Sequence, residues 1–382
     1  MRIAFICKRR YMGKDVIADR YARLYEIPYQ LAARGHDVLG LCLSYHGDPD
    51  GDWQHPTPDG SLRWRSRAVG LAALPRLACS PTWMLRELRA FGPDWVIGAS
   101  DIIHVALGAW CARKLQCSFA ADLYDNFESF GMARIPGAKR ALRDAVRHAA
   151  VVSCTSQALS DHVQRAYGAR GCVITLPSTV DLQRFRPADR MACRDALGLP
   201  RDALLIGTAG GLLGSRGIAT VYRGFSRLAE QDLRVHLVVA GPVDPQHPPP
   251  RDPRVHYLGE LAHERVAELF AALDLGVVYL RDTAFGRYCF PQKAYEMAAC
   301  GLDFVAADVG AMRALLSHAP QRMYAADDAL DLARALREGL ANPGCPPVVP
   351  HDWSQLVATL ESELAHRSRE RGIGGSRPSG RA

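Results

Sequence analysis

Short apolar runs alternate with amphipathic helical stretches along almost the whole chain, and this rhythm limits the folds that it can adopt. Helices are predicted to begin near Asp19, Pro81, Ile103, Gly137 and Ser156. Between them, the predicted strands of the first half are Ile3–Cys7, Asp37–Leu43, Trp95–Ala99, Ser118–Leu123, Val151–Cys154 and Val173–Leu176. Strands that are apolar throughout and separated by helices indicate a parallel sheet covered on both faces.

The same rhythm starts again after residues 177–200, a segment rich in proline and charge. Helices are predicted near Gly217, His263, Pro291, Gly310 and Asp327. The predicted strands are Leu204–Thr208, Val235–Ala240, Val255–Leu258, Leu275–Leu280 and Phe304–Ala307. A chain of 382 residues is too long for one ordinary core. We therefore predict an α/β protein with two doubly wound, Rossmann-like domains that face a central cleft, where ligands bind at the carboxyl ends of the strands.

Four segments follow from this pattern. Residues 1–177 form the first domain and residues 178–350 the second. After a proline-rich link, residues 351–366 form a last amphipathic helix. Glycine, serine and arginine dominate residues 367–382, which we expect to be a disordered basic tail.

The net charge of +7 is unevenly placed. Residues 1–175 hold 23 Lys and Arg against 16 Asp and Glu, whereas the rest holds 24 of each. A basic first domain suits an anionic partner, and the basic amphipathic stretch 139–148 (KRALRDAVRH) is a candidate for contact with an anionic membrane surface. The alternatives are a solvated arginine-rich surface and a helix packed on its sheet. No nucleic-acid partner is predicted.

Cysteine usage and the N-terminal sequence indicate in which cellular compartment the protein is expected. The eleven cysteines are scattered without paired short spacings, which favours buried free thiols in a reducing compartment over disulfides or a zinc site. No apolar stretch approaches the roughly 20 residues of a membrane span. The N-terminal charges follow the first apolar run, which is the wrong order for a signal peptide. We expect a cytoplasmic protein, with a peripheral position on the inner face of the membrane as an option.

A glycine-rich loop, GTAGGLLGSRG at 207–217, follows the first strand of the second domain. Gly210 and Gly211 would let the backbone approach a ligand, and the next helix would offer free N–H groups. Arg216 adds a full positive charge, so the loop suits a phosphate. The alternative is a glycine-rich turn with a solvated arginine.

The stretch FPQKAYEMAACG at 290–301 predicts a short helix, because Pro291 begins it and Gly301 ends it. A lysine near a helix N-terminus is electrostatically misplaced unless an anion binds there, so Lys293 favours a ligand site. Glu296, one turn further along, could accept hydrogen bonds from two vicinal hydroxyls such as those of a ribose. The alternative is an intrahelical ion pair between these two residues.

At these residues the chain resembles glycosyltransferase family 4, the group 1 glycosyltransferases, which are retaining enzymes with the GT-B fold. The most specific segment is 290–301, which is similar to the family's Pro-x-Lys-x-x-Glu sub-pattern. The resemblance covers nearly the whole chain. It also rests on GHDV (35–38), DLYDNFES (122–129), TVDLQRFRPAD (179–189), GGLLGSRG (210–217) and HDW (351–353).

The resemblance implies a nucleoside diphosphate sugar as the donor and Glu296 as the residue that holds its ribose. It further implies that Arg216, Lys293 and the backbone near Phe290 and Gln292 hold the diphosphate, with Gly210 and Gly211 in the phosphate loop and the backbone near Leu258 at the base. The HDW segment implies that the terminal helix crosses back to the first domain. Four positions depart from the family pattern: Tyr288 replaces a glutamate, Gly211 a basic residue, Tyr124 a histidine and Ala18-Asp19 a glycine pair.

The predicted reaction is transfer of a sugar to an acceptor hydroxyl with retention of configuration, in bacterial-type polysaccharide, glycolipid or glycoconjugate synthesis. Fixed positive charge on Arg216 and Lys293 would stabilise the departing diphosphate. Asp125 is the third catalytic candidate. The acceptor, which is a sugar, a lipid-linked molecule or another small molecule, would lie near Arg20, Asp101, Tyr124 and Asp125, although each aspartate is also explained as a turn or helix cap.

No metal and no further cofactor are required by this interpretation. The triplet Asp48-Pro-Asp50, which matches the Asp-x-Asp pattern of some metal-dependent glycosyltransferases, lies in a loop rich in Gly, Pro and Asp and is interpreted as a turn.

Other functions remain open. One is a sugar-nucleotide epimerase or a phosphorylase on the same fold, and another is a non-catalytic binding subunit. A dinucleotide-dependent oxidoreductase is disfavoured, because the loose fingerprint Ala209-x-Gly211-x-x-Gly214 lies mid-chain and lacks its acidic partner.

Overall fold

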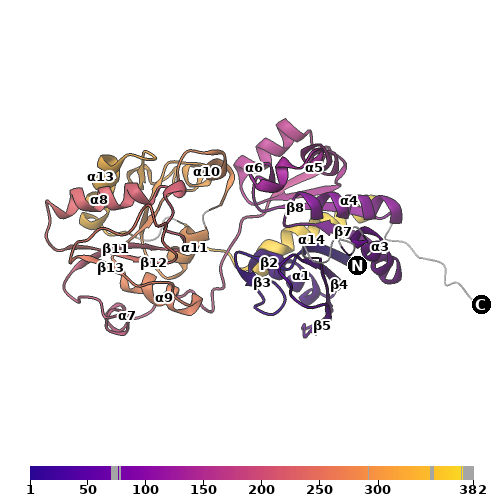
Figure 1. Cartoon of the computed structure of the whole chain (residues 1–382), viewed down its shortest axis with the longest axis horizontal. Helices are drawn as coiled ribbons and strands as arrows, with labels where there is room; N and C mark the ends of the chain where they lie inside the picture. The colour runs from indigo at the N-terminus through magenta and orange to yellow at the C-terminus, as the bar shows by residue number, and fades with distance from the viewer. Residues whose placement is uncertain (70–75, 77–78, 291, 345–347, 371, 373–382) are drawn as a thin grey trace, which may run out of the picture. The chain divides into compact units, whose positions relative to one another are not determined.

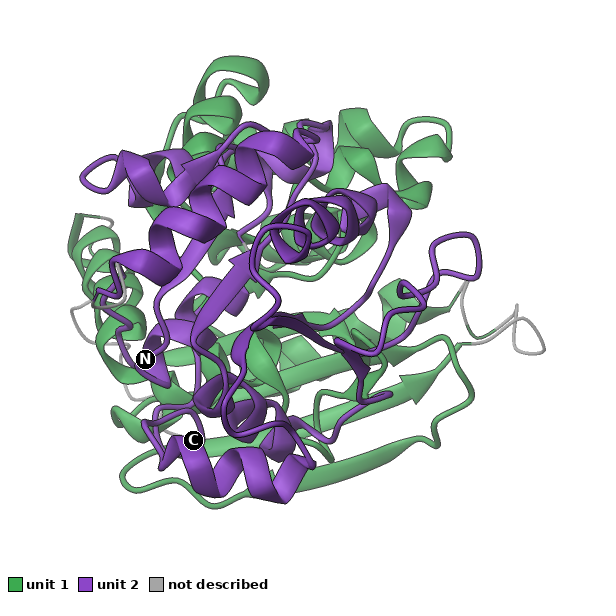
Figure 2. Ribbon diagram, turned by 90° about the vertical axis from the view of Figure 1, so that its left-hand side faces the viewer, with its two compact units in different colours: residues 1–178, 353–382 green, residues 179–352 purple. Residues whose placement is uncertain are grey.

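Two α/β units make up the computed structural model, which describes residues 1–69, 76, 79–290, 292–344, 348–370 and 372. Unit 1 comprises Met1–Ser178 and Trp353–Ala382, and unit 2 comprises Thr179–Asp352 (Figures 1 and 2). The chain therefore leaves unit 1 once and returns to it for its last helix. Within the described residues, no helix combines the length and the apolar character needed to cross a bilayer.

Unit 1 is built on an eight-stranded sheet in the order β10-β9-β8-β7-β1-β4-β6-β5. All neighbouring strands are parallel except the edge pair β5 and β6. The strands are β1 (Arg2–Lys8), β4 (Asp37–Ser44), β5 (Gly51–His55), β6 (Ser61–Ala68), β7 (Trp95–Gly98), β8 (Ser118–Leu123), β9 (Val151–Cys154) and β10 (Cys172–Thr175). The main helices are α1 (Ala22–Ala33), α3 (Ser80–Phe91), α4 (Ile102–Leu115), α5 (Ala138–His148), α6 (Gln157–His162) and α14 (Trp353–Glu370), and a small hairpin joins β2 (Arg10–Tyr11) to β3 (Lys14–Asp15).

Strands β5 and β6 are absent from the strands predicted by sequence. Their pattern alternates instead of being apolar throughout, with Leu62 and Trp64 buried while Arg63 is exposed. An antiparallel edge strand can leave one face in water, so it lacks the continuous apolar run that marked the central strands. The Trp64 ring also covers Gly40 of β4, where a Cβ atom would lie 2.1 Å from the ring.

Unit 2 contains a fully parallel six-stranded sheet in the order β13-β12-β11-β14-β15-β16. Its strands are β11 (Leu204–Ala209), β12 (Val235–Ala240), β13 (Val255–Tyr257), β14 (Leu275–Val278), β15 (Phe304–Ala307) and β16 (Met323–Tyr324). The helices are α7 (Arg190–Leu197), α8 (Ile218–Ala229), α9 (His263–Ala272), α10 (Ala284–Tyr288), α11 (Gln292–Ala299), α12 (Ala311–Leu315) and α13 (Ala329–Ala341). Strand β16 and helices α7 and α10 are short and were not predicted, and Pro291 lies outside the described residues.

Helix α14 belongs to unit 1 and is longer than predicted. It continues to Glu370, so residues 367–370 are helical where the sequence suggested a disordered tail. Ser368 is buried and accepts a hydrogen bond from Trp95 Nε1 at 2.8 Å, which fixes the last turn to β7. The Arg367–Glu370 ion pair of 2.8 Å supports the same turn. Residues 371 and 373–382 of the predicted tail lie outside the described part of the chain.

Ten cysteines are described, and all ten are free thiols. Cys7, Cys42, Cys154 and Cys300 are buried, as the sequence interpretation of buried thiols expects. The eleventh, Cys345, lies outside the described residues.

A buried ion pair ties helix α1 to the centre of unit 1. Arg23 and Asp122 are 2.6 Å apart, with side chains exposed by 1% and 0%. Arg23 Nη1 also donates to the carbonyl of Leu176 at 2.5 Å, and Ser153 Oγ donates to Asp122 at 2.6 Å. Each charge is therefore paired and hydrogen-bonded, which is the condition under which such a pair can be buried without a large penalty.

Removing one partner of this pair should leave an uncompensated buried charge. We expect Arg23→Leu to destabilise unit 1 by about 3–5 kcal/mol. The matched control is Arg113→Leu, because the Arg113–Asp144 pair is 61% and 45% exposed and should contribute only about 0–1 kcal/mol. All six tryptophans lie in unit 1, so urea unfolding followed by tryptophan fluorescence reports on this unit. Equal midpoints for the two variants would contradict the assignment.

Candidate functional site

The first element of the site is the turn that follows β11 in unit 2. Gly210 adopts a left-handed φ of +102°, and a Cβ atom there would lie 2.5 Å from Lys293 Nζ. The Lys293 ammonium therefore lies directly against the backbone of this turn. Only glycine both adopts this conformation without strain and leaves room for the lysine.

The glycine-rich loop does not run straight into helix α8. A single 3-10 turn, Gly214–Arg216, comes first, and Gly214 N–H donates to Asp244 Oδ2 at 3.1 Å while Ile218 N–H donates to the carbonyl of Leu213 at 3.3 Å. Fewer backbone donors are thus available at this helix start than the sequence predicted. The N–H of Gly211 is an exception, since it makes no hydrogen bond to any described residue.

Arg216 makes a cation–π contact with an aromatic side chain. Its guanidinium lies over the Phe285 ring of α10, 5.3 Å from the centroid, and Nη1 would be 3.9 Å from a Cβ atom on Gly211. Tyr279 completes this side of the loop, because its hydroxyl donates to the carbonyl of Gly211 at 2.8 Å. Among the described residues, Arg216 forms no ion pair with a carboxylate, so its charge is available to a ligand.

Lys293 and Glu296 lie on helix α11 but do not form the intrahelical ion pair that their spacing allows. The lysine turns to Gly210, whereas the Glu296 carboxylate faces His263, with 3.7 Å between Glu296 Oε1 and His263 Nε2. Burial lowers the pKa of Lys293, Glu296 opposes this shift, and the nearby Arg216 adds to it. Two partly buried cations therefore lie close together, an arrangement that a bound anion would stabilise.

Glu296 is buried apart from 9% of its surface, and its orientation is set by residues that the sequence did not single out. His263, the first residue of α9, has its other ring nitrogen 2.9 Å from Arg184 Nη1. The same ring packs edge-on against Phe185 at 5.1 Å between centroids. Arg184 and Phe185 lie in the segment 179–189 that carried part of the family resemblance, yet only the fold brings them to α11.

The remaining donor-side candidates surround this helix. Phe290 packs on Tyr295 with 4.7 Å between ring centroids, and Gln292 is the first described residue of α11. Tyr288 ends α10. Leu258 follows β13 and packs against the hydrophobic cluster that includes Ala294, Met297 and Ala298 of α11.

The acceptor-side candidates all lie in unit 1. Asp101 caps α4, and Tyr124 donates through its hydroxyl to the carbonyl of Ser100 at 2.7 Å. Asp125 is buried and accepts a hydrogen bond from Asn126 N–H at 2.7 Å, a local contact that agrees with the turn alternative. Arg20 is exposed with a left-handed φ of 49°, and helix α1 begins only at Ala22 rather than near Asp19.

Both carboxylates of the Asp48-Pro-Asp50 triplet pair with arginines. Asp48 binds Arg10 at 2.5 Å, and this pair lowers the pKa of Asp48 to about 2. Asp50 binds Arg76 and accepts a hydrogen bond from Ala68 N–H. These contacts tie the loop to β2 and β6.

Comparison with known proteins matches both halves of the chain to one group. The profile of Glycosyltransferase Family 4 matches residues 23–184, and that of Glycosyl transferases group 1 matches residues 203–342. A D-inositol 3-phosphate glycosyltransferase of Catenulispora acidiphila is 30% identical over 275 residues, which cover 65% of this chain and 63% of that protein. One of Geodermatophilus obscurus is 29% identical over 228 residues, covering 55% and 48%.

Solved structures resemble the whole chain. Sucrose-phosphate synthase from Thermosynechococcus elongatus has a TM-score of 0.69 at 18% identity, covering 97% of this chain and 98% of that one. Anabaena HepE in complex with UDP-glucose has a TM-score of 0.68 at 16% identity, covering 97% and 100%. At such identities the likeness establishes the fold, which is GT-B.

The chain thus belongs to the group 1, family 4 glycosyltransferases, as the motifs indicated. Its matches span less than two thirds of the length of these two curated relatives.

The electrostatic arrangement at Lys293 can be tested without any ligand. We expect Arg216→Gln to raise the pKa of Lys293, because a neighbouring positive charge is removed, and Glu296→Gln to lower it, because the stabilising carboxylate is lost. The chain has five lysines, so each side-chain signal can be followed in an NMR titration after selective lysine labelling. Lys8 lies in unit 1 and serves as the internal control. The arrangement would be wrong if neither substitution moved the Lys293 midpoint.

Proposed function

We propose that this chain transfers a sugar from a nucleoside diphosphate sugar to an acceptor hydroxyl, with retention of the anomeric configuration. The observation that carries the proposal is the convergence of Lys293 and Arg216 on the Gly210–Gly211 turn. Neither cation is paired with a carboxylate among the described residues. A diphosphate bound at this turn would receive both charges and the N–H of Gly211.

In this mechanism the main task of the protein is to stabilise the departing diphosphate. Negative charge grows on the leaving phosphate as the glycosidic bond breaks, and fixed cations placed there lower the barrier without reorganisation. Arg216 and Lys293 take the role that a divalent metal has in other transferases, so we propose a metal-independent reaction. The leaving phosphate itself accepts the proton of the acceptor hydroxyl, which keeps the attack on the face that the diphosphate leaves.

Glu296 is proposed to bind the ribose of the donor. Its carboxylate can accept hydrogen bonds from two vicinal hydroxyls, each contributing about 1.5–3 kcal/mol. His263 holds the carboxylate from the side of α9. Phe290, Gln292 and the backbone near Leu258 complete the donor side, in line with their positions around α11 and β13.

The identity of the donor is suggested by the similar structures. HepE was crystallised with UDP, with UDP and glucose, and with UDP-glucose. We therefore propose UDP as the leaving nucleotide and a hexose as the transferred sugar. The curated relatives are named as glycosyltransferases of D-inositol 3-phosphate, which favours a polyol or sugar as the acceptor here.

The donor proposal is tested by thermal-shift titration with UDP, GDP, ADP and dTDP. UDP at 100 times its dissociation constant should stabilise the folded state by about 2.7 kcal/mol. Glu296→Ala should weaken UDP binding roughly tenfold to hundredfold without unfolding the protein. Glu338→Ala removes a carboxylate paired with Arg334 on α13 and should leave the affinity unchanged. If none of the four nucleotides stabilises the wild-type protein, the donor site is wrongly assigned.

A second variant tests the close approach of Lys293. Gly210→Ala should force the lysine away and weaken UDP binding by about tenfold or more, because one of two diphosphate contacts is displaced. Gly35→Ala is the control: Gly35 has a φ of +86°, outside the left-handed region that alanine adopts readily, but nothing lies within 4 Å of its Cβ position. An equal loss of binding in both variants would attribute the effect to backbone strain alone.

Turnover separates the proposed enzyme from the alternatives. With UDP-glucose and a panel of sugar and polyol acceptors, the expected products are UDP and an α-glycoside, identified by mass spectrometry and by the anomeric proton in NMR. Isomerised donor would instead indicate an epimerase, and consumption of phosphate a phosphorylase. Donor binding without any turnover would indicate a binding protein.

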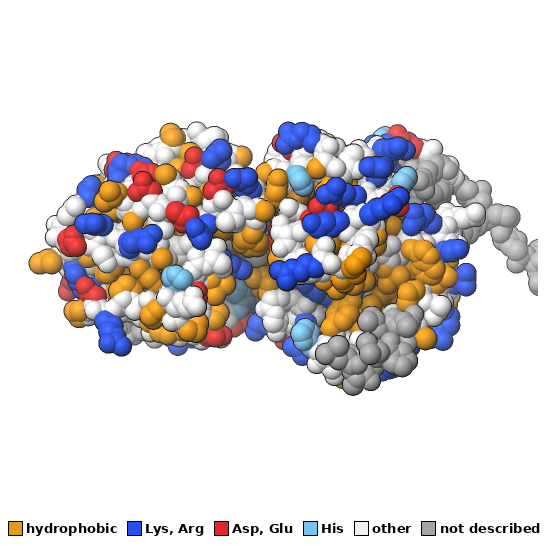
Figure 3. Space-filling view, turned by 45° about the horizontal axis from the view of Figure 1, so that its top comes forward, with side chains coloured by type: hydrophobic (Ala, Val, Ile, Leu, Met, Phe, Trp, Pro, Cys, Tyr) orange, Lys and Arg blue, Asp and Glu red, His pale blue; other side chains and the backbone are white. Residues whose placement is uncertain are grey.

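We propose a peripheral membrane position that depends on electrostatic attraction alone. Helix α5 buries Leu142, Ala145 and Val146, so its apolar face is not available for insertion. Its basic residues Lys139 and Arg140 are exposed, and Lys and Arg side chains are spread over the face of unit 1 seen in Figure 3. In flotation assays we expect binding to vesicles with anionic lipid at low salt and release at high salt. Binding that persists at high salt would contradict a purely electrostatic contact.

A further inference from the structure

Lys8 is the last residue of β1 and lies where several strands of unit 1 end. Ser100 and Asp101 follow β7, and Tyr124 follows β8. Because parallel strands deliver their carboxyl ends to one edge of the sheet, these residues gather there although they are far apart in sequence. Ligands of such sheets bind at this edge.

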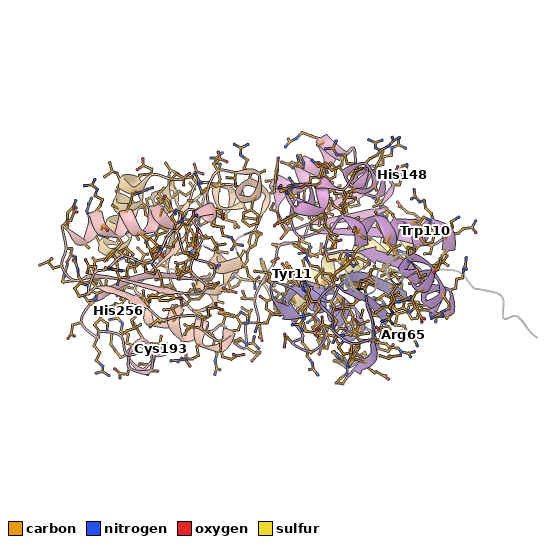
Figure 4. The ribbon with its side chains drawn as sticks, in the orientation of Figure 1. Tyr11, Arg65, Trp110, His148, Cys193 and His256 are labelled. Atoms are coloured by element: carbon orange, nitrogen blue, oxygen red, sulfur yellow. The ribbon has the colours of Figure 1, made fainter. Side chains whose placement is uncertain are left out.

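The Lys8 ammonium lies over the faces of two tyrosine rings. Nζ is 5.8 Å from the ring centroid of Tyr11, which Figure 4 labels, and 5.8 Å from that of Tyr124. Within the described residues, Nζ makes neither an ion pair nor a hydrogen bond. Burial lowers the pKa of Lys8, while Asp101 acts in the opposite direction. A partly buried cation of this kind is stabilised by a bound anion.

Asp101 acts on Lys8 through space, but the structure has no direct ion pair between these two residues, and the carboxylate contacts His104 instead. Oδ1 accepts from the N–H of His104 at 3.1 Å as the cap of α4, and it binds His104 Nδ1 at 2.7 Å. Burial opposes ionisation of Asp101, but His104 and Lys8 lower its pKa. The Asp101 carboxylate thus caps helix α4 and binds the His104 ring.

Ser100 is held in an unusual conformation beside Lys8. Its φ is +79°, a left-handed value that is rare for residues other than glycine. Its hydroxyl accepts from the N–H of Lys8 at 2.9 Å, and its carbonyl accepts from Tyr124. Strained residues that are fixed from both sides are typical of functional sites.

Two buried polar atoms next to this cluster have no hydrogen-bond partner. They are His104 Nε2 and the hydroxyl oxygen of Tyr45, on rings whose centroids are 5.9 Å apart at an interplanar angle of 87°. His104 itself has no exposed surface. In the neutral imidazole, with Nδ1–H of His104 donating to the Asp101 carboxylate, Nε2 is an acceptor, whereas the Tyr45 hydroxyl can donate. A hydroxyl group that reaches both atoms would satisfy them.

We propose that this cluster binds the acceptor, and that the acceptor carries an anionic oxygen group, such as a phosphate monoester, which is held by Lys8. A hydroxyl of the same molecule bonds to His104 and Tyr45, and the tyrosine rings pack on its carbon skeleton. The inference rests on the proposed function only in naming the ligand as the acceptor. It adds the chemical class of that acceptor.

Inorganic phosphate is the probe, and saturating UDP keeps it from the donor site. With selectively labelled lysines, addition of phosphate should shift the Lys8 signal in a saturable manner, whereas chloride at equal ionic strength should not. Lys8→Met should weaken phosphate binding about tenfold, and Lys8→Arg should retain it. Lys114→Met removes an exposed lysine of the same unit and should have no effect. Tryptophan fluorescence of each variant checks that unit 1 remains folded.

The two proposals fail separately. If UDP stabilises the protein but phosphate leaves the Lys8 signal unchanged, the acceptor inference is overturned and the donor site stands. If Lys8→Met and Lys114→Met bind phosphate equally, Lys8 is likewise excluded. A Lys8 response to phosphate without any nucleotide binding would retain the anion site and overturn the proposed reaction.

Discussion

In a parallel sheet, every strand delivers the segment that follows it to the same edge, and both units of this chain depend on that constraint. It brings Lys8 near Ser100, Asp101 and Tyr124 in unit 1. In unit 2 it places the turn after β11 beside the helix that follows β14, so that Gly210 meets Lys293. Residues separated by more than eighty positions thus share one environment because of sheet topology.

The candidate sites share a second property, which is positive charge held without a carboxylate partner. The buried arginines of the described residues are all paired: Arg9 with Asp15, Arg23 with Asp122, Arg194 with Asp274 and Arg322 with Asp303. Arg216, Lys293 and Lys8 differ, since aromatic rings or backbone surround them. Because these three cations are partly buried and lack a carboxylate partner among the described residues, a bound anion would stabilise them.

The sequence predicted the central strands and most helix starts, and it singled out Arg216, Lys293 and Glu296 as donor-site candidates, because each of these depends on local pattern. A lysine at a helix start and a glycine-rich turn are visible in a short window. The contacts of His263 with Glu296 and of Lys8 with two tyrosines join distant segments, so no local pattern reveals them. The phosphate loop was predicted with more free N–H groups than it has, because Asp244 and the turn before α8 take several of them. The strands β5 and β6 were missed because they alternate in polarity.

The return of α14 to unit 1 makes unit 2 an insertion within unit 1. During translation, the whole of unit 2 emerges before the ribosome has made helix α14, which contacts β7. Until then Trp95 lacks Ser368, and Arg34 and His36 lack Glu361. Unit 1 therefore cannot complete these contacts until α14 has been made, although its first residues are synthesised before those of unit 2.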